Sequence, residues 1–206
     1  MVRTTASLHA SLDALAERED AFAKALDAHG RPEPRASEPG VETLLRTFVG
    51  QQVSVAAARS MWNKLSAKFG QPVNLEALLA ASDEEMREAG MSRQKAGYLR
   101  SLAGLVLSGE LDLAHLPEDD EEAIAQLIKI KGIGRWSAEI YLLFAEGRHD
   151  IWPAGDLAVQ IEIGKLLGLD GKPTEKQLRE LAEAWRPHRG AAAVLAWHSY
   201  NAPPLD

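Results

Sequence analysis

Residues 127–160 read LIKIKGIGRWSAEIYLLFAEGRHDIWPAGDLAVQ and carry the strongest structural signal in the chain. Apolar residues at helical spacing stop at Gly132-Ile133-Gly134 and resume directly after it. Two glycines around one apolar residue predict a tight hairpin between two helices, because glycine tolerates positive φ and Ile133 can fill the space between the helices. A hairpin that leads into a helix N-terminus exposes backbone N–H groups, which suit an anion such as phosphate.

Two features of this segment have a purely structural interpretation as well. A bare G-x-G is more often a simple helix–helix connection without a ligand. Asp156, in the Pro/Gly turn WPAGDLAV, opens another helix and would serve as its N-cap whether or not it has a further role. The longer pattern, in which Arg135-Trp136 and Ser137 follow the hairpin and Asp156 lies downstream, favours a functional site.

The rest of the chain predicts an all-α protein, because apolar residues recur at helical spacing and no sustained two-residue alternation is present. Residues 1–40 predict one amphipathic helix and a Pro-rich loop that pack on the core, and residues 41–206 predict the core itself. Several short polar residues precede apolar runs and are predicted helix N-caps, two of them in capping boxes: Ser54, Ser82 with Glu85, Ser92, and Thr174 with Gln177.

Composition restricts the class of protein. A chain of 206 residues is long enough for one core or two packed helical lobes. The absence of cysteine excludes disulfides, zinc–thiolate sites and iron–sulfur clusters. No apolar run is long enough to span a membrane, and the N-terminus lacks the pattern of a secretory signal, so we expect a cytoplasmic, nucleoid-associated protein of bacterial type.

The formal net charge of −7 argues mildly against a nucleic-acid partner. Much of that charge lies in the acidic run from Glu118 to Glu122, which is typical of a solvated helix N-terminus. The overall charge therefore does not decide the partner.

Five segments, in this order, resemble the helix–hairpin–helix (HhH-GPD) DNA glycosylase superfamily and, within it, the 3-methyladenine DNA glycosylase II family: FVGQQVSVAAA (48–58), GMSRQKAGYLRSLA (90–103), GIGRWSAE (132–139), WPAGDLAV (152–159) and WRPHRGAAAVLAW (185–197). The resemblance implies a two-lobed helical fold with a cleft between the lobes. It also implies an enzyme that flips alkylated purines, such as 3-methyladenine and 7-methylguanine, out of double-stranded DNA and hydrolyses the glycosidic bond.

The same resemblance implies roles for four side chains around the reacting base. Asp156 matches the catalytic aspartate, whose carboxylate stabilises an oxocarbenium-like sugar or orients water. Trp136, Trp197 and Ile140 match positions that line the base pocket, where an aromatic face attracts a cationic alkylated base. Plain core packing remains the alternative for both tryptophans, and Ile140 stands where some relatives have tyrosine.

The resemblance also indicates the reaction type. Trp136 stands where bifunctional members of the superfamily have a lysine that forms a Schiff base. Members that resemble endonuclease III often carry a cysteine-ligated cluster, and this chain has no cysteine. We therefore expect a monofunctional hydrolase without abasic-site lyase activity, acting as a monomer.

DNA contacts are implied by the matching positions. Gln51 and Gln52 would probe the helix and fill the gap left by the flipped base, a role that some relatives give to an apolar wedge. Lys95 is a further candidate phosphate contact, with ordinary solvated charge as the alternative. The remaining predicted DNA-binding residues lie at one helix start and in the hairpin: Arg93, Lys131, Gly132, Ile133, Gly134, Arg135 and Ser137.

No cofactor is expected to be required. The family's hairpin often holds a monovalent cation, sodium or potassium, through backbone carbonyls, and the matching carbonyls are those of Ile128, Ile130 and Ile133. Two other functions stay open on the sequence: a non-catalytic helix–hairpin–helix module that binds DNA, and a glycosylase for other damaged bases.

Overall fold

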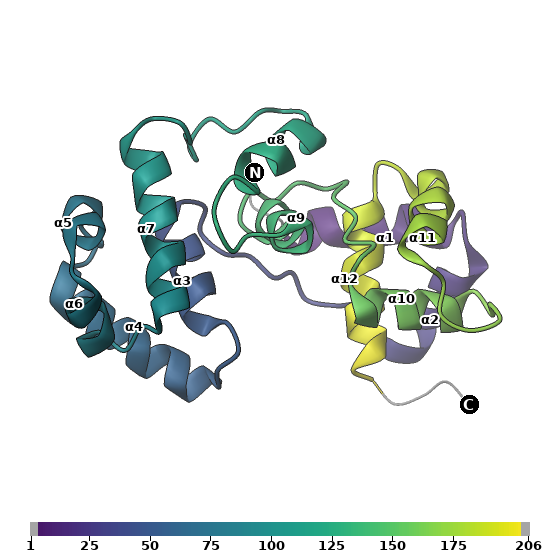
Figure 1. The fold of residues 1–206 in the computed structure, drawn as a ribbon. Helices are drawn as coiled ribbons and strands as arrows, with labels where there is room; N and C mark the ends of the chain where they lie inside the picture. Colours follow the sequence, from purple (N-terminus) through teal and green to yellow (C-terminus); the bar gives the residue numbers. More distant parts are fainter. Residues whose placement is uncertain (1–3, 203–206) are drawn as a thin grey trace. The chain divides into compact units, whose positions relative to one another are not determined.

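The computed structural model describes residues 4–202, and every regular element within that range is helical (Figure 1). The prediction of an all-α protein is confirmed. Residues 1–3 and 203–206, the outer ends of the predicted regions 1–40 and 41–206, lie outside the described residues. Among the described helices, none combines the length and apolar character that crossing a membrane requires.

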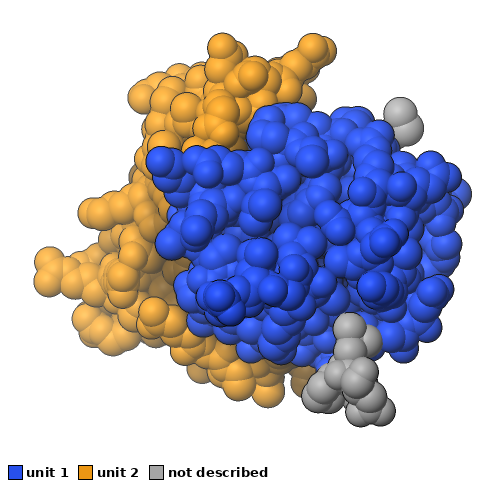
Figure 2. All heavy atoms as spheres, turned by 90° about the vertical axis from the view of Figure 1, so that its right-hand side faces the viewer, with its two compact units in different colours: residues 1–37, 139–206 blue, residues 38–138 orange. Residues whose placement is uncertain are grey.

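The chain forms two compact units, shown in different colours in Figure 2. Unit 1 combines residues 1–37 with residues 139–206, and unit 2 comprises residues 38–138. The boundary between Ala138 and Glu139 falls inside one helix, α9 (Arg135–Phe144), so this helix contributes its first turn to unit 2 and the rest to unit 1.

Unit 2 is built from consecutive helices that pack side by side, with α7 in contact with α3, α5 and α6. Their bounds are α3 (Val41–Gly50), α4 (Val55–Phe69), α5 (Leu75–Ala80), α6 (Asp83–Glu88), α7 (Arg93–Leu107) and α8 (Asp120–Leu127). Fully buried leucine and phenylalanine side chains fill the space between them: Leu44, Leu45, Phe48, Leu65, Leu78, Leu99 and Leu102. Burying such side chains is the main favourable contribution to folding.

Short polar side chains start several helices of both units, as predicted. The Ser54 hydroxyl accepts from the Ala57 N–H, and the Ser92 hydroxyl accepts from the Lys95 N–H. Capping boxes are present at both predicted places, at Ser82 with Glu85 and at Thr174 with Gln177. Each cap satisfies N–H groups that have no partner within the first turn of a helix.

Unit 1 is organised around its C-terminal helix, α12 (Arg189–Tyr200). Its contacts are with α1, α2, α10 and the short 3₁₀ helix η1. The bounds of the other elements are α1 (Thr5–Ala16), α2 (Asp20–His29), α10 (Leu157–Leu166), α11 (Glu175–Leu181) and η1 (Ala182–Trp185). Residues 191–196 of α12 are all buried, which the small side chains of Ala191, Ala192 and Ala193 allow because neighbouring helices can approach closely.

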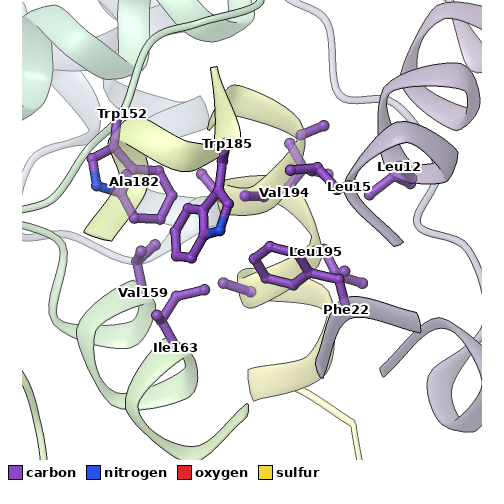
Figure 3. Packing of buried hydrophobic residues seen from close by; sticks show 14 of the residues in the cluster. Leu12, Leu15, Phe22, Trp152, Val159, Ile163, Ala182, Trp185, Val194 and Leu195 are labelled. Atoms are coloured by element: carbon purple, nitrogen blue, oxygen red, sulfur yellow. The ribbon is translucent and has the colours of Figure 1, made fainter. Parts of the chain in front are cut away.

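Aromatic side chains form the centre of this core (Figure 3). The Trp185 ring meets Phe22 edge to face at a centroid distance of 5.0 Å and meets Trp152 in the same way at 5.4 Å. These arrangements are the favoured ones for aromatic rings. Trp62, Trp152 and Trp185 are all buried.

The prediction of a single helix in the first forty residues is wrong. The chain forms α1 and α2, separated by a turn in which the Arg18 and Glu19 N–H groups both donate to the Leu15 carbonyl. The turn folds α2 back on α1, so that Leu15 and Phe22 both reach the core beside α12. One continuous helix would bury this apolar stripe along a line, whereas the two short helices bury it in one compact core.

Replacing Phe22 with alanine tests this arrangement. We expect the Phe22→Ala variant to lower the free energy of unfolding by about 3–5 kcal/mol, because it removes a fully buried ring and leaves a cavity beside Trp185. Urea denaturation followed by circular dichroism measures the change. A matched Val55→Ala variant, at a side chain 88% exposed, should stay within about 0.5 kcal/mol. A loss below about 1 kcal/mol for Phe22→Ala would contradict the packing of α2 in the core.

Candidate functional site

Asp156 is the N-cap of α10. Its backbone is extended, with φ −72° and ψ 125°, and its Oδ1 accepts a hydrogen bond from the Val159 N–H at 3.0 Å. Asp156 therefore caps α10, as the sequence predicted. The carboxyl group is partly buried, so capping does not remove it from the surface.

A second donor reaches the same oxygen from α12. The Trp197 indole Nε1–H donates to Asp156 Oδ1 at 3.1 Å, and the Trp197 ring packs against Phe144 of α9 at a centroid distance of 5.6 Å. Because the indole is itself held by a neighbouring ring, it restricts the orientation of the carboxylate. Two predicted site residues of unit 1, Asp156 and Trp197, are thus in direct contact.

The backbone just before Asp156 is held by a buried glutamine that the sequence analysis did not single out. Gln160 is only 7% exposed, and its Nε2 donates to the Ala154 carbonyl at 2.8 Å. Its Oε1 accepts from the Lys172 ammonium at 2.7 Å. Both ends of a buried amide are therefore satisfied, and the loop is tied to α10 one turn below the aspartate. A glutamine between Val159 and Ile161, in the apolar first half of α10, was the available signal.

Trp152 anchors the start of the same loop. Its indole Nε1–H donates to the Leu178 carbonyl at 3.2 Å, and its ring lies in the core of unit 1. Arg179 of α11 binds Glu139, a carboxylate only 2% exposed, at 3.0 Å. Burying an ion pair is costly unless its geometry is well satisfied, so this pair fixes α11 against α9 rather than adding much stability.

The predicted hairpin lies between α8 and α9. Gly132 has φ +90°, and a Cβ at this position would lie 2.6 Å from the ring of Tyr98. Both the backbone conformation and the close approach require glycine. Ile133 is buried, as predicted. Gly134 differs from the prediction, because it has no positive φ and a Cβ there would meet nothing within 4 Å.

The other predicted residues of the hairpin are placed on the surface. Lys131 is exposed, and Arg135 at the first position of α9 forms a bidentate ion pair with Glu121, in which Nη1 lies 2.8 Å from Oε2. Ser137 is partly buried. Trp136 is 48% exposed, an unusual position for so large an apolar side chain. Its side chain therefore presents a large apolar surface to solvent.

The turn between α3 and α4 carries Gln51 and Gln52. Gln52 has φ +56°, a left-handed conformation that is uncommon outside glycine and costs free energy. Both glutamines border a cavity of about 300 Å³ that Lys95 and Tyr98 also line. The predicted contact Arg93 lies exposed at the first position of α7.

The carbonyls predicted for a monovalent cation lie in the turn that follows α8. The Ile130 carbonyl accepts from the Ile133 N–H at 3.0 Å, which leaves a second lone pair for a cation. Ile130 is fully buried, whereas the Ile128 side chain is 48% exposed. The monovalent-cation site stays a prediction. No group of three metal-binding side chains occurs among residues 4–202.

The predicted residues fall into two groups. Unit 1 contains Asp156, Trp197 and the half-buried Ile140, whereas unit 2 contains Trp136, the hairpin and the turn at Gln51. In unit 1 the structure brings Asp156 and Trp197 together and adds Gln160, and in unit 2 it adds Tyr98 beside Gly132.

Comparisons with known proteins identify the family to which the chain belongs. The model of the HhH-GPD superfamily base excision DNA repair proteins matches residues 45–187. DNA-3-methyladenine glycosylase 1 of Schizosaccharomyces pombe is 34% identical over 160 residues, which is 76% of this chain and 70% of that protein. The chain spans 57% of the length of one similar curated relative and 82% of another.

Solved structures share the fold. A DNA-3-methyladenine glycosidase from Bacillus halodurans aligns with a TM-score of 0.84 and 27% identity, over 93% of this chain and 89% of that one. The Schizosaccharomyces pombe 3-methyladenine DNA glycosylase in complex with abasic DNA aligns with a TM-score of 0.73 and 28% identity, over 92% and 94%. With a match over most of its length and the hairpin, the N-cap aspartate and the helical fold in place, the chain belongs to the HhH-GPD superfamily of base excision DNA repair proteins.

Proposed function

We propose that this protein is a monofunctional DNA glycosylase that flips alkylated purines out of duplex DNA and hydrolyses their glycosidic bond, leaving an abasic site. The observation that carries the proposal is the position of the Asp156 carboxylate, whose Oδ1 accepts hydrogen bonds from the Val159 N–H and from the Trp197 indole. Relatives named as 3-methyladenine DNA glycosylases support the substrate class.

The chemistry needs little more than a well-placed carboxylate. As the glycosidic bond breaks, its electron pair leaves with the base, and the sugar acquires oxocarbenium character. A carboxylate beside the anomeric carbon stabilises that charge, and a preorganised group does so without reorganising during the reaction. Water then adds to the anomeric carbon and loses a proton. The two donors to Asp156 Oδ1 supply this preorganisation.

Alkylation explains the choice of base. A purine alkylated at a ring nitrogen is cationic and a better leaving group, and a cation over an indole face gains about 0.5–2 kcal/mol. Trp136 offers a large exposed indole, and we assign it and Trp197 to base binding. Flipping a base out of the duplex costs about a few kcal/mol. The cost is smallest for a damaged and poorly paired base, which favours lesions over normal bases.

DNA contacts come from the hairpin and from the turn at Gln51 and Gln52. A net charge of −7 means that the chain as a whole does not attract DNA, so binding depends on local groups. The backbone at Gly132 and the exposed Lys131 are such groups. The monomer and the cytoplasmic location remain part of the proposal.

Replacing Asp156 with asparagine tests the catalytic role. We expect the Asp156→Asn variant to release 7-methylguanine or 3-methyladenine at least about a hundredfold more slowly, because it loses the charge that stabilises the transition state. The Oδ1 acceptor for Val159 and Trp197 is kept, so folding and duplex binding should persist. Single-turnover release from methylated duplex DNA measures the rate.

A matched control is Asp119→Asn. Asp119 caps α8 in the same way, with Oδ1 accepting from the Glu122 N–H at 2.9 Å, and should keep full activity. Undiminished base release by Asp156→Asn would remove Asp156 from its role. Damaged-duplex binding without base release by the wild-type protein across a lesion panel would instead favour a non-catalytic DNA-binding module.

Replacing Trp197 with phenylalanine separates orientation from packing. Phenylalanine keeps an aromatic ring beside Phe144 but loses the N–H that reaches Asp156. We expect the single-turnover rate to fall about tenfold, because the variant loses one hydrogen bond to a charged group. The melting temperature should change little. An equal fall on neutral and cationic lesions would attribute it to the hydrogen bond. An unchanged rate would show that the indole does not orient the carboxylate.

The reaction should end at the abasic site. Because Trp136 offers no amine for a Schiff base, we expect no covalent adduct with abasic duplex DNA in the presence of borohydride. Methylated duplex treated with the protein should stay intact until alkali is added. Strand cleavage before alkali, together with a trapped adduct on a gel, would make the enzyme a glycosylase/lyase.

A further inference from the structure

One side of α7 contacts both segments that the proposed function places on DNA. Lys95, Tyr98 and Ser101 follow each other at intervals of three residues, so they lie within about 120° of one another around the helix. The segment GMSRQKAGYLRSLA (90–103) contains all three. Lys95 contacts the end of α3, whereas Tyr98 and Ser101 contact the hairpin before α9.

Lys95 holds the end of α3. Its Nζ donates to the carbonyl of Val49, the penultimate residue of α3, at 2.7 Å, and the turn at Gln51 and Gln52 follows the last residue of that helix. The ammonium is partly buried there, and this burial lowers the pKa of Lys95 from its usual value. A charged donor on an unsatisfied helix-terminal carbonyl is a strong hydrogen bond.

Tyr98 links the same helix to the hairpin. Its ring lies against the backbone of Gly132, where a Cβ would come within 2.6 Å of the ring. The ring also packs on Phe48 of α3 at a centroid distance of 5.5 Å. One aromatic side chain therefore touches both α3 and the hairpin.

Ser101 completes the row one turn further along α7. Its hydroxyl accepts a hydrogen bond from the Lys131 N–H at 3.0 Å, directly before Gly132. Over the six residues from Lys95 to Ser101, the helix rises about 9 Å. The rigid helix thus fixes how far apart the turn and the hairpin are held.

The turn needs such support. Gln52 adopts φ +56°, a conformation that persists only where the surroundings impose it. Its neighbour Val53 is 38% exposed, so core packing alone does not impose it. The Lys95 ammonium on the Val49 carbonyl is a polar contact at the end of α3, three residues before Gln52.

We propose that Lys95, Tyr98 and Ser101 are positioning residues that set the turn at Gln51 and Gln52 and the hairpin at Gly132 in register for one DNA duplex. Lys95 acts through the turn and does not bind a phosphate. The proposal rests on the proposed function for the identity of the ligand, whereas its structural part concerns only contacts within unit 2.

The first experiment separates positioning from phosphate binding. Lys95→Met keeps the aliphatic stem but removes the donor, and Lys95→Arg keeps a charged donor. The probe is a duplex that contains a tetrahydrofuran abasic-site analogue, with the dissociation constant measured between 50 and 300 mM salt. Lys176→Met, which removes an exposed charge of unit 1, is the matched control.

We expect Lys95→Met to weaken binding about tenfold with an unchanged slope of log K against log salt, Lys95→Arg to restore most of the affinity, and the control to bind normally. A phosphate contact would instead lower the slope by about 0.9. A lowered slope, or unaltered binding by Lys95→Met, would overturn the proposal for this residue.

The second experiment measures hydrogen exchange in the turn and in the hairpin and requires neither DNA nor base release. Hydrogen exchange measured by mass spectrometry should show about tenfold faster exchange in residues 50–54 of Lys95→Met, with residues 131–134 little changed. Ser101→Ala should show the reverse, because it releases the Lys131 N–H. Uniform loosening of unit 2 by either variant, or no change in these segments, would overturn the proposal. A wild-type protein that binds DNA but releases no base would contradict the proposed function and leave this result unaffected.

Discussion

The carboxylate of Asp156 caps the N-terminus of α10 and accepts hydrogen bonds there from two groups of different origin. The Val159 N–H belongs to the same helix, while the Trp197 indole comes from the C-terminal helix α12. Both bonds end on Oδ1, so the plane of the carboxylate depends on how α10 and α12 pack. A group that must stabilise a short-lived cationic sugar gains from such rigidity, since nothing has to reorganise when the charge develops.

Several polar contacts of unit 1 hold the loop before Asp156 in place. Asp150 bonds to Arg189 at the start of α12 at 2.9 Å and to Arg186 at 2.7 Å, which ties the loop to the helix that carries Trp197. Gln160 holds the loop from below through the Ala154 carbonyl. These contacts satisfy polar groups, among them the buried Gln160 amide, and they restrict the conformation of the loop. In unit 2, side chains of α7 have a similar positioning role. Lys95, Tyr98 and Ser101 position the turn at Gln51 and Gln52 and the hairpin at Gly132.

Sequence patterns predicted the parts of the structure that depend on local chemistry. The caps at Ser82 and Thr174, the glycine requirement at Gly132 and the cap at Asp156 follow from hydrogen bonds or φ angles within a few residues. The break between α1 and α2 was missed, because it depends on both helices packing on α12, nearly the whole chain away.

The same limit applies to the site. The resemblance to a family pointed to Asp156 and Trp197, but the bond between them joins residues far apart in the sequence. The Lys95 ammonium was expected among phosphate contacts, yet the structure places it on a carbonyl of α3. A lysine in the first turn of a helix has the same local pattern in either role, so only the tertiary structure distinguishes them.

The central claim, that Asp156 stabilises a positive charge on the sugar, has a direct test in binding. Duplex DNA with a pyrrolidine abasic analogue carries a cationic nitrogen in the sugar ring, whereas the tetrahydrofuran analogue is neutral. The wild-type protein should bind the cationic analogue about tenfold or more tightly than the neutral one, which is the effect expected of one close charge pair. In Asp156→Asn the ratio of the two dissociation constants should fall towards unity. An equal preference for the cation in both proteins would contradict the role assigned to this carboxylate.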